Sequence, residues 1–224
     1  MKNIKSRLNK KPRAIIFDWD NTLADTWPTI HEALTHTFVT MGKEPWTFEQ
    51  TKEKVHRSLR DSFPEIFHDK WEEAGQLYLD YFESVHIERL TPIKHAKEML
   101  DALKETGIYT AVVSNKTGYN LRSEISHLGW GHYFAKQIGA KDAKNDKPHP
   151  DPIYLALEGS GIEPNKDVWL IGDSLTDLEC AYNAKCKPVF YGDQDLTDAR
   201  FAHVQPDLHI SDHQQLHQII KDLV

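Results

Sequence analysis

The sequence predicts an α/β protein, a Rossmann-like parallel sheet with helices on both faces, into which a small all-helical domain is inserted. Two observations predict this class. After residue 92, short continuous apolar runs alternate with segments whose apolar residues recur at helical spacing. Between residues 25 and 91, apolar residues recur only at helical spacing. We therefore expect a core made of residues 1–24 and 92–224 and a helical domain made of residues 25–91.

The first predicted strand, residues 14–17, is short and apolar along its whole length. A strand that is buried on both faces has this composition, because neither of its faces meets water. Helix ends are marked as well, since Gly107 and Gly129 follow helical patterns and glycine is common directly after a helix. We expect strands over residues 14–17, 108–114, 137–139, 167–173, 188–192 and 207–210.

The inserted region contains two strong helical patterns. They span residues 27–41 and 67–85, with apolar side chains three or four positions apart. Between them, Val55 and Leu59 suggest a shorter helix that ends near Pro64. These patterns predict a helical unit of roughly the size of a small bundle.

Composition excludes several classes of protein. The formal net charge is −7, so the chain lacks the overall positive charge typical of proteins that bind nucleic acid or anionic membranes. No apolar run approaches the ~18 residues that a membrane-spanning helix requires. The first dozen residues are basic without an apolar segment, which favours a short tail over a secretory signal. Cys180 and Cys186 form no recognised motif, so we expect a cytoplasmic protein with reduced, buried thiols.

Polar side chains follow the predicted strands at the points where the strands end. The carboxyl ends of parallel strands meet at one edge of the sheet, where such folds bind ligands. Carboxylates ~4 Å apart repel by about 4 kcal/mol at an effective dielectric constant of ~20. Mg²⁺, which prefers oxygen ligands, removes that repulsion, and a lysine and a hydroxyl beside a carboxylate suit phosphoryl transfer. The side chains concerned are Asp18, Asp20, Ser114, Asn115, Lys147, Asp173 and Asp177.

Four short motifs carry a resemblance to a known family. The segments DWDNT, SN, KPHPD and GDSLTD occur in this order, each at the end of a predicted strand or in the loop that follows one. They resemble the four motifs of the haloacid dehalogenase (HAD) superfamily of phosphohydrolases, and the likeness spans nearly the whole chain. The helical region resembles the cap of the phosphoglycolate phosphatase-like branch. The resemblance implies a phosphatase acting on a small phosphorylated metabolite, with 2-phosphoglycolate as the first substrate to consider.

The resemblance also implies a role for each motif residue. Asp18 would attack phosphorus and form an aspartyl-phosphate, while Asp20 would protonate the leaving oxygen and then activate water. Mg²⁺ would be held by Asp18, the backbone carbonyl of Asp20, and Asp173. Asp177 would bind the ion or support its ligands, and Thr22 would orient the loop of the first motif. The phosphoryl group would be bound by Asp18, Trp19, Asp20, Ser114, Asn115 and Lys147, with Ser114 and Lys147 also taking part in catalysis.

Two residues of the first motif bear on the alternatives. Asp20 supplies an acid that dehalogenases lack, which argues against carbon–halogen chemistry. Asn21 stands where glycine is commonest in the family, and asparagine tolerates the left-handed backbone conformation better than most residues.

A sugar phosphomutase resembling β-phosphoglucomutase and a nucleotide phosphatase remain open alternatives. A non-enzymatic phosphoacceptor or binding protein is disfavoured by the complete motif set. We expect a monomer or a homodimer.

Two arginines of the helical region are candidates for substrate specificity. Arg57 and Arg60 are three residues apart, which places them on one side of a helix. From there they could bind a substrate carboxylate or a second phosphate. Charged pairs are common on helices, so pairing with Glu53 or Asp61 on a solvated face is the favoured interpretation.

Overall fold

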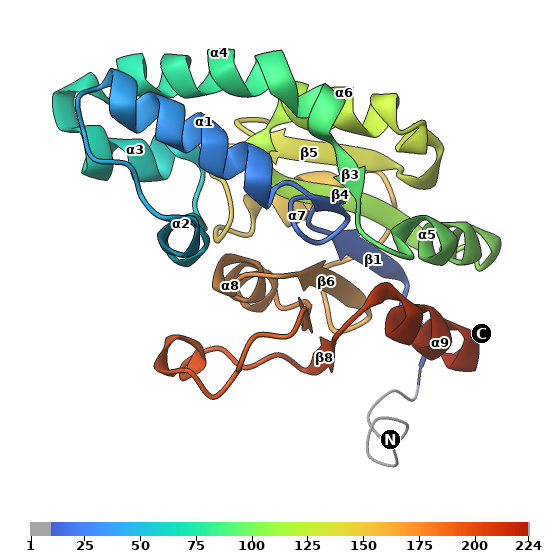
Figure 1. The fold of residues 1–224 in the computed structure, drawn as a ribbon. Coiled ribbons are helices and arrows are strands. Elements are labelled where there is room, and N and C mark those ends of the chain that lie inside the picture. The colour runs from blue at the N-terminus through green and yellow to red at the C-terminus, as the bar shows by residue number, and fades with distance from the viewer. Residues whose placement is uncertain (1–9, 224) are drawn as a thin grey trace.

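The computed structural model describes residues 10–223 and has a six-stranded parallel sheet at its centre (Figure 1). The strand order is β5-β4-β1-β6-β7-β8, so β1 lies in the middle, with Phe17 beside Val112 and Ile171. All six expected strands are confirmed, with small shifts at their ends. They are β1 (Ala14–Phe17), β4 (Tyr109–Thr117), β5 (Lys136–Ala140), β6 (Val168–Gly172), β7 (Lys187–Tyr191) and β8 (Leu208–Ile210).

Helices cover both faces of the sheet, as expected. Ile15 and Phe17 of β1 share a hydrophobic core with α5, α6 and α9, whereas Ala14 and Ile16 pack with α7 and α8. Because both faces of the sheet are covered, the central strands β1 and β6 are apolar and buried at every position. These helices are α5 (Ala96–Glu105), α6 (Gly118–His127), α7 (Asp151–Leu157), α8 (Leu175–Asn183) and α9 (His213–Leu223). Short 3-10 turns are η2 (Trp130–Tyr133) and η3 (Ala199–Phe201).

The region between β1 and α5 folds as four helices, which we call the helical insert (residues 27–89). It has a hydrophobic core of its own, formed by residues that include Ile30, Leu34, Phe38, Phe63, Phe67 and Phe82. A two-stranded antiparallel ribbon of β2 (Ala24–Asp25) and β3 (Thr91–Pro92) joins the insert to the sheet (Figure 1). The insert comprises α1 (Trp27–Thr40), α2 (Phe48–Lys54), α3 (Leu59–Phe67), η1 (His68–Lys70) and α4 (Trp71–Arg89).

The short helix predicted around Val55 and Leu59 is wrong. Two helices, α2 and α3, take its place, and Val55 is extended between them. Thr47 and Gln50 form a capping box that begins α2 ahead of the apolar pattern. Pro64 lies inside α3 instead of ending a helix, because the apolar face of α3 is held by the core of the insert.

Three sequence-based expectations concern the ends of the chain, the cysteines and membranes. Residues 1–9 of the expected basic tail lie outside the described residues, while Lys10 forms an ion pair with Asp167 on the core. Cys180 and Cys186 are free thiols buried in one of the two sheet cores, as expected. Within residues 10–223, no helix combines the length and apolar character that crossing a membrane requires.

Candidate active site

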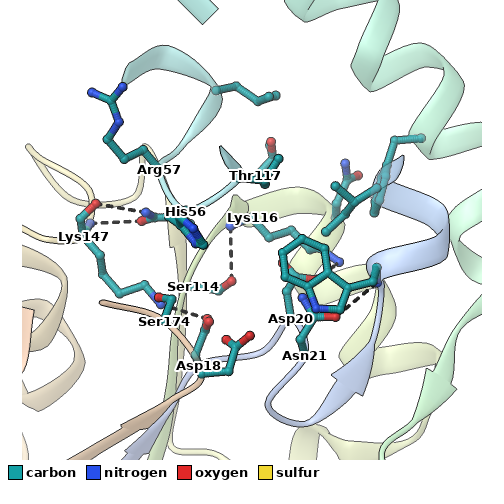
Figure 2. A pocket seen from close by; sticks show the side chains of 18 of the residues that line it. Asp18, Asp20, Asn21, His56, Arg57, Ser114, Lys116, Thr117, Lys147 and Ser174 are labelled. Atoms are coloured by element: carbon teal, nitrogen blue, oxygen red, sulfur yellow. Dashed lines mark hydrogen bonds and ion pairs between the residues drawn. The ribbon is translucent and has the colours of Figure 1, made fainter. Parts of the chain in front are cut away.

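The carboxyl end of β1 points at a pocket between the sheet edge and the helical insert (Figure 2). The chain turns sharply there at Asn21, whose φ of 57° is in the left-handed region. The side-chain oxygen of Asn21 accepts hydrogen bonds from the backbone N–H groups of Thr26 and Trp27, at 3.2 and 3.1 Å. Asparagine therefore both permits the turn and anchors the start of α1.

The pocket collects residues from segments that are far apart in the sequence. Of the residues predicted from the sequence, those that line it are Asp18, Asp20, Arg57, Ser114, Asn115, Lys147 and Asp173. Trp19, Arg60 and Asp177 are not among its lining residues. The helical insert supplies an apolar wall made of Trp27, Ile30, Val55, Leu59, Tyr78, Leu79 and Phe82.

Lys147 lies at the centre of the acidic cluster. Its Nζ is 2.8 Å from Asp18 Oδ1 and 2.7 Å from Asp177 Oδ1, and it donates to the backbone carbonyl of Val113 at 2.9 Å. The lysine is buried, and although burial by itself lowers the pKa of Lys147, Asp177 and Asp18 raise that pKa above its usual value. Lys147 therefore stays charged and offsets part of the repulsion between the carboxylates.

Three carboxylates at this edge fit a hard divalent cation. Oxygen atoms of Asp18, Asp173 and Asp177 lie within 4.8 Å of one another. Burial raises the pKa of Asp18 to about 7, against the opposing effect of Lys147, and burial also raises the pKa of Asp173. A bound cation favours the ionised carboxylates, and an all-oxygen donor set of this kind suits Mg²⁺. One lysine leaves the three carboxylates with an excess of negative charge, so these residues fit the ion.

Asp177 organises the cluster through both of its carboxylate oxygens. Oδ1 is bound to Lys147, while Oδ2 accepts from the backbone N–H of Ser174 at 3.1 Å and from its hydroxyl at 2.5 Å. Gly172, at the end of β6, makes room for this carboxylate, because a Cβ on it would lie 2.2 Å from Asp177 Cγ. Both oxygens of Asp177 are therefore engaged by donors of the protein itself.

Ser114 and Asn115, which lie near the carboxyl end of β4, make different hydrogen bonds. Ser114 is buried at the pocket, where its Oγ accepts from the backbone N–H of Lys116 at 3.2 Å. The amide of Asn115 makes a two-way bond with the backbone of Lys147, donating to its carbonyl at 2.9 Å and accepting from its N–H at 3.0 Å. The Asn115 side chain thus fixes the loop that carries Lys147.

A second buried lysine, which the sequence reasoning missed, lies next to Asp20. Lys116 Nζ is 2.7 Å from Asp20 Oδ1 and 2.7 Å from each oxygen of Glu124 on α6. Glu124 also accepts from the indole N–H of Trp19 at 2.5 Å and contacts His86 Nδ1 on α4 at 2.7 Å. The signal in the sequence was Trp19 itself, because a buried indole N–H requires an acceptor.

The two arginines of the insert make different contacts from those predicted. Arg57 precedes α3 and is bound to Glu65, while Arg60 lies within α3, so the shared helical side predicted for them is wrong. Arg60 makes two bonds of 2.6 Å to Asp146, which is buried in the loop after β5. The prediction that Glu53 or Asp61 pairs with them is also wrong, and Arg60 instead ties the insert to the core.

The family is established by comparison with known proteins. The parallel sheet, the inserted helices and the acidic strand ends define an α/β enzyme with a helical domain inserted after its first strand. More particularly, the chain belongs to the haloacid dehalogenase-like hydrolases, whose family model matches residues 15–190. The resemblance read from the motifs, and the prediction that the chain is an enzyme, are thereby confirmed.

Its relatives carry two kinds of name. A putative pyrophosphatase PpaX from Caldanaerobacter subterraneus is 32% identical, covering 94% of this chain and 96% of the relative. A phosphoglycolate phosphatase from Pectobacterium atrosepticum is 29% identical over 91% of this chain and 95% of the relative. Among solved structures, a HAD-superfamily hydrolase from Ehrlichia chaffeensis is 32% identical with a TM-score of 0.64, covering 96% of this chain and 98% of that one.

Proposed function

We propose that this protein is a Mg²⁺-dependent phosphomonoesterase that acts on a small phosphorylated metabolite through an aspartyl-phosphate on Asp18. One observation carries the proposal. Asp18 lies at the pocket within the same buried cluster as Asp173, Asp177 and Lys147, two residues from a second carboxylate, Asp20. A carboxylate nucleophile, a cation site and a fixed lysine are the groups that phosphoryl transfer requires.

The first half of the reaction forms the phosphorylated enzyme. An oxygen of Asp18 attacks phosphorus as the bond to the leaving oxygen breaks, and Asp20 gives that oxygen its proton. Lys147 and Ser114 line the pocket beside Asp18 and bind the equatorial oxygens of the phosphoryl group. Asp18, Asp173 and the backbone carbonyl of Asp20, supported by Asp177, would hold Mg²⁺, which would supply positive charge to the transferring group.

The second half releases phosphate and restores the enzyme. Asp20, now ionised, takes a proton from a water molecule, which attacks the phosphorus of the aspartyl-phosphate. The acyl-phosphate bond breaks, the carboxylate of Asp18 re-forms, and Asp20 ends with the proton that it had lost. The two aspartates after β1 therefore have separate roles, one as nucleophile and one as acid and base.

We also propose that residues 25–91 form a cap over a core of residues 1–24 and 92–224. Supporting this, the insert has its own hydrophobic core and supplies the apolar wall of the pocket. The chain passes between the two parts only at the β2–β3 ribbon, where a hinge would lie. A cap that closes on the substrate excludes water while the phosphoryl group is transferred.

We consider several classes of substrate for this site. Relatives are named for phosphoglycolate and pyrophosphate, and 2-phosphoglycolate is the first substrate that we propose to test. Arg57 lines the pocket and could bind a negative group on the substrate if it released Glu65. A sugar phosphomutase and a nucleotide phosphatase would use the same core residues and remain the alternatives.

The experiment is an assay of phosphate release from p-nitrophenyl phosphate, 2-phosphoglycolate, pyrophosphate, a sugar 1-phosphate and a nucleoside monophosphate. We expect hydrolysis with Mg²⁺ and its loss in excess chelator, with recovery when Mg²⁺ is returned. Isomerisation of the sugar 1-phosphate without release of phosphate would identify a mutase. Undiminished turnover in chelator, or no hydrolysis of any compound, would overturn the proposal.

A further inference from the structure

Asp20 is held by one of its two oxygens. Thr26 Oγ1 donates to Oδ1 at 2.7 Å, and Lys116 Nζ lies 2.7 Å from the same atom. For Oδ2, the structure gives no hydrogen bond to any of residues 10–223. Asp20 lines the pocket, and its side chain is 18% exposed. Holding Oδ1 fixes the rotation of the carboxyl group and leaves Oδ2 as the oxygen to exchange a proton.

Lys116 is itself held by contacts other than its bond to Asp20. Both oxygens of Glu124 bind its ammonium group, and the Phe82 ring lies under it, with 4.8 Å between Nζ and the ring centre. The side chain is 5% exposed, so a lysine that normally explores many rotamers has one position here. Glu124 also balances the charge of Lys116, so the ammonium group is placed beside Asp20 as part of a neutralised cluster.

Glu124 is positioned by two further side chains. The indole N–H of Trp19, the residue between Asp18 and Asp20, donates to one carboxylate oxygen of Glu124. His86 of α4 contacts the other oxygen. Glu124 is fully buried, and although burial alone raises the pKa of Glu124, Lys116 and the two hydrogen bonds hold that pKa below its usual value. Because α4 belongs to the insert, the network joins the predicted cap to the acid–base residue.

We propose that Lys116 is a positioning residue for Asp20, held in place by Glu124, and that His86 connects the helical insert to this unit. The proposal rests on the proposed function, in which Asp20 moves the protons. A carboxyl group that is held through one oxygen presents its second oxygen to the leaving group in a fixed orientation. This increases the reaction rate when proton transfer limits the step. Water then meets the same oxygen in the second half of the reaction.

The test compares two substrates of similar shape that differ in their need for an acid. Benzyl phosphate releases an alkoxide, which needs a proton, whereas p-nitrophenyl phosphate releases a stable phenolate. We measure kcat/KM, which reports only the steps up to leaving-group release. In Lys116→Met we expect kcat/KM for benzyl phosphate to fall about 10²-fold, the low end of the effect of losing acid catalysis, and that for p-nitrophenyl phosphate to fall only a few-fold.

Two further variants and one control complete the design. Glu124→Gln keeps the shape of the side chain and should give the same selective loss to a smaller degree, as should His86→Phe. The Glu124→Gln variant also keeps the proposal testable if circular dichroism shows that Lys116→Met does not fold. Lys187→Met removes a half-buried lysine that lies over the Trp169 ring, 5.0 Å from its centre, and should leave both substrates unaffected.

The outcomes separate the positioning proposal from the proposed function. If the unmodified protein hydrolyses neither substrate, the proposed function fails. If it hydrolyses both, and folded Lys116→Met and Glu124→Gln lose the two activities equally or lose neither, the function stands and the positioning role is refuted.

Discussion

Within residues 10–223, two buried lysines are each bound to one of the two aspartates that follow β1. Lys147 joins Asp18 to Asp177 of α8, and Lys116 joins Asp20 to Glu124 of α6. The first cluster is made only of residues from the core. The second reaches the helical insert through His86. The difference means that Asp18, the proposed nucleophile, is positioned by the core alone, whereas Asp20, the proposed acid and base, is positioned where core and insert meet.

The largest effect should come from Asp20→Asn, which removes the proposed proton carrier that Lys116 contacts. We expect kcat/KM for benzyl phosphate to fall by about 10²–10⁴-fold, the usual contribution of general acid–base catalysis. The fall for p-nitrophenyl phosphate should be much smaller, because its leaving group needs no proton. Equal losses for the two substrates, measured at saturating Mg²⁺, would remove Asp20 from the acid role.

Lys147→Met should act differently from Lys116→Met. In the proposed mechanism Lys147 binds the phosphoryl group, which is common to both substrates, so we expect kcat to fall about 10²–10³-fold for both. The variant also leaves buried Asp18 and Asp177 without their partner, and breaking a buried ion pair costs about 3–5 kcal/mol of unfolding free energy. Urea unfolding measures this cost. A loss confined to benzyl phosphate would mean that the two lysines have the same role.

The smallest effect concerns a third buried contact to the β1 loop, which involves no lysine. His213 of α9 is bonded through Nε2 to the carbonyl of Thr22 at 2.7 Å, and burial lowers the pKa of His213 to about 4. As the pH is lowered, this histidine binds a proton near pH 6.5 in the unfolded chain but only near pH 4 in the native protein. The free energy of unfolding therefore falls as the pH drops from about 6.5 to about 4. The total loss of unfolding free energy that His213 contributes over this range is about 3 kcal/mol.

His213→Gln tests this pH dependence, because glutamine keeps a donor for the Thr22 carbonyl and does not titrate. Urea unfolding across this pH range should show a weaker decline in the variant than in the unmodified protein. Identical declines would show that carboxylates alone account for the acid sensitivity.

The sequence predicted the first lysine cluster and missed the second for a physical reason. Asp18, Lys147 and Asp177 sit in motifs whose order places them at strand ends, so their meeting follows from the topology. Glu124 lies on the buried side of α6, eight residues after Lys116, and no strand-end argument places it there.

Contacts between insert and core were also beyond the sequence. Arg60 pairs with Asp146, 86 residues away, because α3 begins only after Ser58 and aims the arginine at the loop after β5. Local spacing indicated partners on the same helix, and the helix boundary that decides the matter was predicted wrongly. The parallel sheet, by contrast, was predictable, since its central strands β1 and β6 are buried along their whole length.

The most direct test of separate roles for the two aspartates is to trap the covalent intermediate. Asp20→Asn should form the aspartyl-phosphate readily from p-nitrophenyl phosphate but hydrolyse it slowly, since no base remains to activate water. Quenching with borohydride reduces an aspartyl-phosphate to homoserine, which mass spectrometry locates in the sequence. We predict homoserine at position 18. Modification at another residue, or an unmodified Asp18 while p-nitrophenol is being released, would contradict the account.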